Sequence, residues 1–175
     1  GHFTDLEEFI AASDFEDTRS TIGILFYGGM HFDQSVSTVR AFTNELKEFN
    51  IIPVYANGVH NLRAIKRYFF GNGKPLVDAV INLMWFRING GPLGGNPALT
   101  AELLKELNVP FFAPAPMLMR EVEKWRESPT GLSPIEIIAA VVWPELDGSI
   151  EPKPSCGMQD IIVGEIEAKE VAPID

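Results

Sequence analysis

Continuous apolar runs alternate with amphipathic stretches along most of this chain. Four runs, at 21–27, 51–55, 78–84 and 109–112, have the length of strands that are covered on both faces. Between them, apolar residues recur at three- and four-residue spacing, which indicates helices that bury one side. Strands alternating with helices predict an α/β fold. We expect a doubly wound, mainly parallel sheet of the Rossmann or flavodoxin-like kind, flanked by helices and followed by a C-terminal extension.

Two amphipathic helices are expected in the first half of the chain. Asp33 or Ser35 could cap the first of them, because both side chains accept hydrogen bonds from free amides. The apolar residues that mark the two helices are Val36, Val39, Phe42, Leu46 and Phe49, and then Leu62, Ile65 and Phe69.

Three further helices are expected in the second half. Asn96 and Pro97 predict the start of one helix, since asparagine caps free amides and proline needs no partner in the first turn. Ser133 and Glu136 form a capping box that starts another. The stripes expected to face inward are Leu99, Leu103 and Leu107, then Leu118, Val122 and Trp125, and finally Ile135 and Ile138.

The two ends of the chain depart from this alternation. Residues 1–19 are expected to form an N-terminal helical segment whose apolar face, with Leu6, Phe9 and Ile10, needs a partner surface. The α/β domain is expected over 20–150. A C-terminal extension is expected over 151–175; it is β-prone at 160–166 and links to a following domain. We therefore expect an excised domain of a longer protein.

Composition narrows the class of protein. The 175 residues are 46% hydrophobic, enough for one domain with a substantial core. A net charge of −10 repels nucleic acid and anionic lipid, so we expect neither as a partner. No apolar run reaches the roughly 18 residues needed to cross a bilayer. The single cysteine, Cys156, rules out an internal disulfide, and we expect a cytoplasmic protein.

Candidate chemistry gathers at one edge of the predicted sheet. In an open parallel sheet, ligands bind beyond the carboxyl ends of the strands, where the loops 28–34, 56–61 and 85–96 should meet. Tyr27, His31 and Asp33 lie in or beside the first loop. The imidazole of His31 could ligate a metal or protonate a ring nitrogen, or it could merely hydrogen-bond a neighbouring loop.

The loop that begins at Trp85 is long and rich in glycine. Trp85 could stack on a flat macrocycle, Arg87 could pair with a peripheral carboxylate, and Asn89 adds an amide. The other interpretation is a packing loop in which Trp85 covers the edge of the sheet. These ingredients suit a large planar ligand without selecting one.

Nucleotide and metal sites are not expected in this chain. The glycines at 28–29 lack dinucleotide-loop spacing, and Pro75 stands where a phosphate loop after Lys74 requires serine or threonine. The three histidines are far apart and Cys156 is alone, so no metal-ligand cluster and no bound cofactor are predicted.

An ordered set of motifs carries a resemblance to a known family. The segments are GILFYGGMH, IIPVYANG, VDAVINL, GGP, LNVPFFAPAP, KWRESPTGLSP and VVWPELDGSIEP, in this order between 21 and 152. Together they resemble the large, tetrapyrrole-binding subunit of the ATP-dependent cobaltochelatases and magnesium chelatases. Those enzymes insert cobalt or magnesium into a tetrapyrrole on the way to cobalamin or chlorophyll.

The resemblance implies a division of labour. The full subunit would bind the tetrapyrrole and the metal ion as substrates, while an AAA+ ATPase subunit and its adaptor subunit would use the ATP. Within this chain the expected tetrapyrrole contacts are Tyr27, His31, Trp85, Arg87 and Asn89. His31 is the catalytic candidate, and the fragment alone is expected to be inactive.

The sequence leaves the metal and the role open. GGP and PELDGSIEP suggest a magnesium-type subunit, whereas LFY and GLSP suggest a cobalt-type one. A stand-alone small-ligand sensor and a non-catalytic scaffold that docks the ATPase subunits remain as alternatives.

Overall fold

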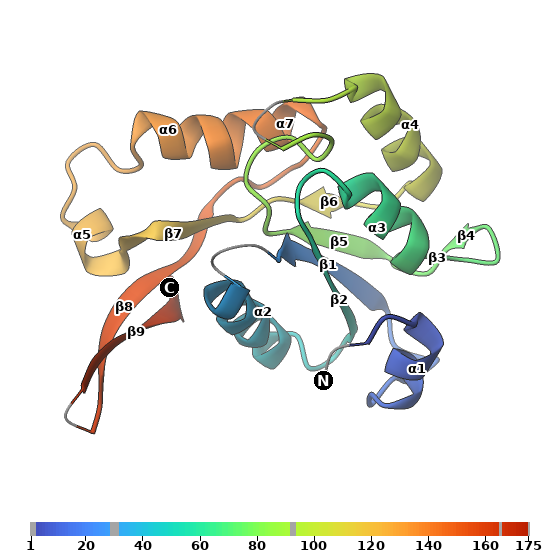
Figure 1. Ribbon diagram of the computed structural model, residues 1–175, viewed down its shortest axis with the longest axis horizontal. Coiled ribbons are helices and arrows are strands. Elements are labelled where there is room, and N and C mark those ends of the chain that lie inside the picture. Colours follow the sequence, from blue (N-terminus) through green and yellow to red (C-terminus); the bar gives the residue numbers. More distant parts are fainter. Residues whose placement is uncertain (1–2, 29–31, 92–93, 165, 175) are drawn as a thin grey trace.

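Four parallel strands form the central sheet of the computed structural model, which describes residues 3–28, 32–91, 94–164 and 166–174. The sheet order is β2-β1-β5-β6, with every neighbouring pair parallel (Figure 1). The strands are β1 (Thr21–Tyr27), β2 (Asn50–Ala56), β5 (Ala79–Asn82) and β6 (Phe111–Phe112). All four overlap the predicted apolar runs, so the predicted parallel sheet is confirmed.

Helices cover both faces of this sheet. On one face, Val39 of α2 (Phe32–Glu45) packs with Ile24 and Ile81 of the strands. On the other face, α3 (Asn61–Tyr68) and α4 (Pro97–Leu107) pack against a core that includes Leu25. Neighbouring residues of β1 thus point to opposite layers, as the pleat of a strand requires. The doubly wound α/β architecture is confirmed.

The segment after β6 adds a second, smaller sheet of order β7-β8-β9. The strands are β7 (Ala115–Glu121), β8 (Pro154–Val163) and β9 (Ile166–Pro173). β7 and β8 are parallel, β8 and β9 form an antiparallel hairpin, and β9 packs against α2 (Figure 1). The C-terminal extension therefore pairs with the α/β domain.

Between β7 and β8 the chain is mostly helical. The elements are α5 (Val122–Arg126), α6 (Pro134–Ile137), the π-helical turn η1 (Ile138–Val142) and α7 (Trp143–Leu146). The last three form one stretch in Figure 1. The widened π turn precedes Pro144, which has no amide hydrogen and whose ring would crowd a regular α-helical turn.

Two short elements complete the fold at the other end of the sheet. The helix α1 (Leu6–Ala11) begins at Asp5, whose carboxylate accepts hydrogen bonds from the amides of Glu7 and Glu8. A two-stranded hairpin, β3 (Phe70–Gly71) and β4 (Lys74–Pro75), follows α3.

Three predictions about helices were wrong. Leu118 lies in β7 rather than in a helix, because pairing with β8 outweighs a short helical spacing. In α6 and η1, Ile135 and Ile138 are exposed, while Glu136 is buried in an ion pair with Arg120. That pair turns the polar side of the helix inward. In α4, Leu99 is also exposed, although Leu103 and Leu107 are buried as predicted.

Candidate functional site

The described parts of the three predicted loops meet at the carboxyl edge of the central sheet. The amide of Gly28 donates a hydrogen bond to the carbonyl of Ala56, with 2.9 Å between nitrogen and oxygen. Gly58 approaches the backbone of Gly91 so closely that a β-carbon on Gly58 would lie 3.6 Å from the α-carbon of Gly91. Small residues at these positions allow the loops to pack together.

The longest of these loops is held to η1 and α7 by Phe86 and to β7 by Trp85. The indole Nε1 of Trp85 donates to the carbonyl of Pro116 at 2.9 Å, and its ring meets Phe86 edge-on at 6.3 Å. Phe86 in turn packs on Trp143 of α7, with ring centroids 5.3 Å apart. The amide of Phe86 donates to the carbonyl of Ala139 at 2.6 Å. Trp85 is only half-buried, so part of its surface stays accessible.

Arg87 makes an ion pair inside the protein. Its Nε donates to Oδ1 of Asp147 at 2.8 Å, and its Nη2 contacts the same oxygen. The second carboxylate oxygen of Asp147 accepts from the amide of Ile88 at 2.7 Å. The Asp147 side chain is 1% exposed and that of Arg87 is 21% exposed. One carboxylate therefore fixes both the side chain and the backbone of the loop.

The electrostatics of Arg87 follow from this contact. The hydrogen bond that Arg87 donates to Asp147 raises the pKa of the Arg87 guanidinium, and the attraction between the two charges adds to this rise, against an opposing effect of burial. The arginine stays charged, and its charge is balanced locally. A ligand carboxylate would have to share Arg87 with Asp147.

The tip of the loop is closed by its own backbone. Asn89 Nδ2 donates to the carbonyl of Asn96 at 3.0 Å. Gly90 has a φ of 91°, and a β-carbon there would lie 2.3 Å from the carbonyl oxygen of Gly94. Only glycine fits at this position.

The remaining predicted contacts are divided between open surface and undescribed chain. Tyr27, at the end of β1, is 37% exposed and accessible from this edge. Asn89 is half-buried at the loop tip. His31, Pro92 and Leu93 lie outside the described residues. The described part of the site thus offers the phenol of Tyr27, one surface of Trp85 and the loop tip.

Sequence reasoning missed three buried polar residues at this edge. Asp147 looked like ordinary turn chemistry before a glycine, and its partner Arg87 is 60 residues away. Asn61 accepts from the amide of Gly58, and Asn82 accepts from that of Met84. Both asparagines are fully buried, and each carboxamide nitrogen lacks an acceptor. An asparagine inside the apolar run DAVINLM was the one available signal.

Two structural features are absent from the described ranges and bear on the class of site. Within those ranges, no group of three or more histidine, cysteine, aspartate or glutamate side chains is arranged to hold a metal ion. Over the same residues, no helix combines the length and the apolar character that crossing a bilayer requires.

Comparison with known proteins identifies the family. The profile of the CobN/Magnesium Chelatase family matches residues 1–175. The chain belongs to the CobN/magnesium chelatase family.

Individual relatives agree with this assignment. An uncharacterized protein of Methanocaldococcus jannaschii is 32% identical over 166 residues, which is 86% of this chain and 13% of that protein. The magnesium-chelatase H subunit of Cereibacter sphaeroides is 31% identical over 131 residues, 75% of this chain and 11% of the relative. The chloroplastic ChlH subunit of magnesium chelatase from Oryza sativa is 36% identical over 110 residues, 62% of this chain and 8% of the relative.

The chain therefore spans about a tenth of the length of these curated relatives. Within this CobN/magnesium chelatase domain, the loop just ahead of the GGP motif contacts the VVWPELDGSIEP motif. Phe86 packs on Trp143, and Arg87 pairs with Asp147.

Proposed function

We propose that this chain is one domain of the large subunit of a metal chelatase that inserts Mg²⁺ or Co²⁺ into a tetrapyrrole, and that it partly lines the tetrapyrrole site. The observation that carries the proposal is the family match over residues 1–175, joined by relatives named as the H subunit of magnesium chelatase. The carboxyl edge of the sheet is the part of the domain that faces the tetrapyrrole.

The geometry supports separate roles for the predicted contacts. Tyr27 and Trp85 present accessible aromatic surface at one edge, which suits the face or rim of a flat macrocycle. The side chain of Asn89 joins the two ends of the loop by donating to the carbonyl of Asn96. Arg87 acts mainly as a positioning residue, because Asp147 already holds its Nε and Nη2. His31 is the candidate for proton transfer beside these groups.

Other parts of the complex would supply the energy and the remaining contacts. The metal ion and the tetrapyrrole are substrates of the complete subunit. An AAA+ ATPase subunit and its adaptor bind and use ATP, and the other domains of the large subunit close the site. This chain holds no cofactor of its own in this proposal, and alone it does not insert metal.

One observation favours a second candidate role, that of a scaffold for the ATPase subunits. Arg87 and the indole nitrogen of Trp85 are both engaged by the protein itself. A domain that uses these groups internally could serve to hold its neighbours in place.

Porphyrin binding to the chain separates the two roles. The shift in porphyrin absorbance on titration would be compared for the intact chain, Tyr27→Ala and Trp85→Ala. Loss of an aromatic contact worth about 0.5–1.5 kcal/mol should weaken binding by roughly two- to tenfold. Lys153→Ala is the matched control, because Lys153 is exposed and its charge partner Glu151 is exposed too.

The Arg87→Ala variant sharpens the result. If Arg87 positions the loop, this variant should weaken binding of a porphyrin with esterified carboxylates as much as that of the free acid. Selective loss of the free acid would show that Arg87 pairs directly with a carboxylate. Equal affinity in all variants would leave only the scaffold role.

A further inference from the structure

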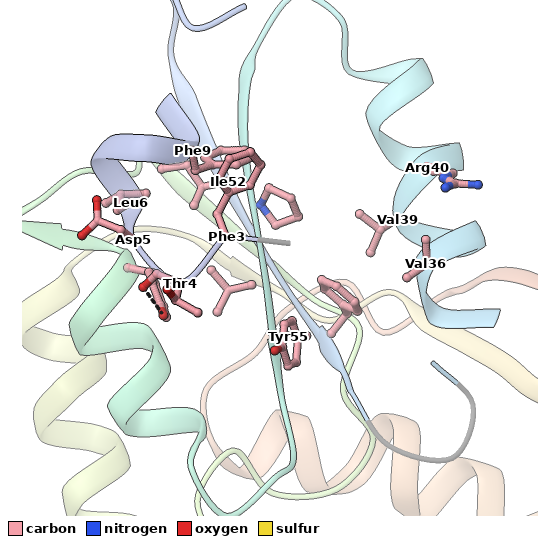
Figure 2. Close-up of a pocket in the computed structure, with 14 residues that line it drawn as sticks. Phe3, Thr4, Asp5, Leu6, Phe9, Val36, Val39, Arg40, Ile52 and Tyr55 are labelled. Carbon is pink, nitrogen blue, oxygen red and sulfur yellow. Dashed lines mark hydrogen bonds between the residues drawn. The ribbon is translucent and has the colours of Figure 1, made fainter. Parts of the chain in front are cut away.

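A second surface of this domain is open and apolar, on the opposite side of β2 from β1. A cavity of about 630 Å³ lies between α1 and α2, along the edge of β2 (Figure 2). Its lining is mostly apolar and comes from α1 and the residues before it, β1, α2, β2 and α3. The residues used below are Phe3 and Phe9 beside or in α1, Tyr55 in β2, and Val36 and Arg40 in α2. We call this cavity the β2 groove.

The floor of the β2 groove is a strand edge that resists strand addition. The amide of Asn50 donates to the carbonyl of Ser20, and the carbonyl of Ala56 accepts from the amide of Gly28. The backbone amides and carbonyls of the even-numbered residues of β2 therefore point towards β1. In a parallel ladder the alternate residues face the other way, so Pro53 faces the open edge. Proline has no amide hydrogen and interrupts any strand that would pair there. An occupant of the groove must therefore bind through side chains.

The walls of the groove leave apolar surface exposed. None of the residues of α1 is buried, although Phe9 belongs to its apolar face. Tyr55 is 44% exposed and Phe3 is 39% exposed. The N-terminal wall is nevertheless held in place, because Tyr68 Oη and Arg67 Nη2 both donate to the carbonyl of Thr4, at 3.2 and 3.1 Å. The groove is thus a formed surface with solvent where a partner would lie.

We propose that the β2 groove receives an amphipathic helix from the part of the same polypeptide that lies outside residues 1–175. The curated relatives are about ten times as long as this chain, and a polypeptide of that length would have many further elements to pack. A helix fits because it satisfies its own backbone hydrogen bonds and offers one apolar stripe. A second copy of this chain is disfavoured, because each copy carries a net charge of −10.

Charge on the two rims orients the helix. On the α1 side the groove lining includes the acidic Asp5, and on the α2 side it includes the exposed Arg40 (Figure 2). The helix should present basic residues towards α1 and an acidic residue towards Arg40. The proposal goes beyond the chelatase function and does not depend on it, since it concerns packing within the polypeptide.

Thiol labelling tests the groove in the complete protein. Tyr55→Cys places a reporter in the groove, and Glu102→Cys places a matched one on the exposed side of α4. The native Cys156 is buried and reacts slowly by comparison. Labelling of each introduced cysteine would be followed by mass spectrometry, in the 175-residue chain and in the complete polypeptide. Arg40→Cys, on the rim, serves as a second reporter if Tyr55→Cys does not fold.

The proposal expects at least tenfold slower labelling of the groove cysteine in the complete polypeptide, with unchanged labelling at position 102. Equal rates in the two proteins would overturn it. Protection that grows with the concentration of the 175-residue chain would indicate a second copy instead. Protection only after porphyrin is added would indicate a ligand site. The amide of Ile51 points to the open edge of β2. If its hydrogen exchange were as slow as that of the paired amides in the central sheet, an added strand would be indicated. No readout uses chelatase activity, so a failed function leaves this result intact.

Discussion

Removing the carboxylate of Asp147 should release the loop that forms the candidate site. In the native protein this carboxylate accepts from Arg87 and from the amide of Ile88. In Asp147→Ala, the guanidinium of Arg87 and the fully buried amide of Ile88 both lose their acceptor. The resulting cost falls on the folded state, because both groups are hydrated in the unfolded chain.

The size of the effect follows from the burial of the two partners. Breaking a fully buried ion pair on one side costs about 3–5 kcal/mol. The value is lower here, because the Arg87 side chain is 21% exposed and keeps some contact with water. Leaving a buried amide without an acceptor costs about 1–3 kcal/mol. The two effects overlap at one carboxylate, and we expect a loss of about 3 kcal/mol in the free energy of unfolding.

Urea unfolding measures this loss, with Lys153→Ala as the control. The Lys153–Glu151 pair is exposed on both sides and screened by water, so its removal should leave the urea midpoint essentially unchanged. The double variant Arg87→Met/Asp147→Leu should lose less than the sum of its single variants, because neither charge remains alone. A loss below about 1 kcal/mol for Asp147→Ala, or additive single effects, would refute the role assigned to this pair.

Two further predictions concern the core and the second sheet. Gly23→Ala should destabilise the protein by about 1–3 kcal/mol, because a β-carbon there would lie 2.7 Å from ring atoms of the buried Phe69; an unchanged urea midpoint would contradict this packing. Burial raises the pKa of the Cys156 thiol above its ordinary 9.0, more than hydrogen bonds with Ser155 and Thr38 lower it. The contribution of this thiol to stability is therefore complete below pH 9.0 and falls as the pH rises further, when the unfolded thiol ionises first. Cys156→Ala should lessen that fall, and a parallel pH profile in both proteins would contradict it.

The central sheet could be predicted because its two middle strands, β1 and β5, are buried along almost their whole length. Such strands appear in the sequence as continuous apolar runs, and the pattern depends on few distant contacts. The start of α4 was equally readable, since Asn96 caps the helix within the local sequence. Local signals of this kind predict the structure correctly because the tertiary contacts favour the same conformation.

Residues whose role depends on a distant partner could not be predicted in this way. Asp147 reads as a turn residue until its contact with Arg87 is known. Leu118 stands at helical spacing from Val122 and Trp125, but its segment forms β7 by pairing with β8, which begins 36 residues later. The sequence predicted Arg87 as a tetrapyrrole contact, which stays a prediction, and it gave no sign of the ion pair with Asp147.

If this chain is a working domain of a metal chelatase large subunit, damage to its candidate site must slow metal insertion. The most direct test is metal insertion into a porphyrin, followed by fluorescence, using the complete large subunit with its ATPase and adaptor subunits and Mg-ATP. Large subunits carrying Asp147→Ala or Trp85→Ala would be compared with the native one and with Lys153→Ala. We expect full activity for the native protein and for Lys153→Ala, much lower activity for the two loop variants, and no insertion by the 175-residue chain alone. Native activity in both loop variants, or turnover by the chain alone, would contradict the claim.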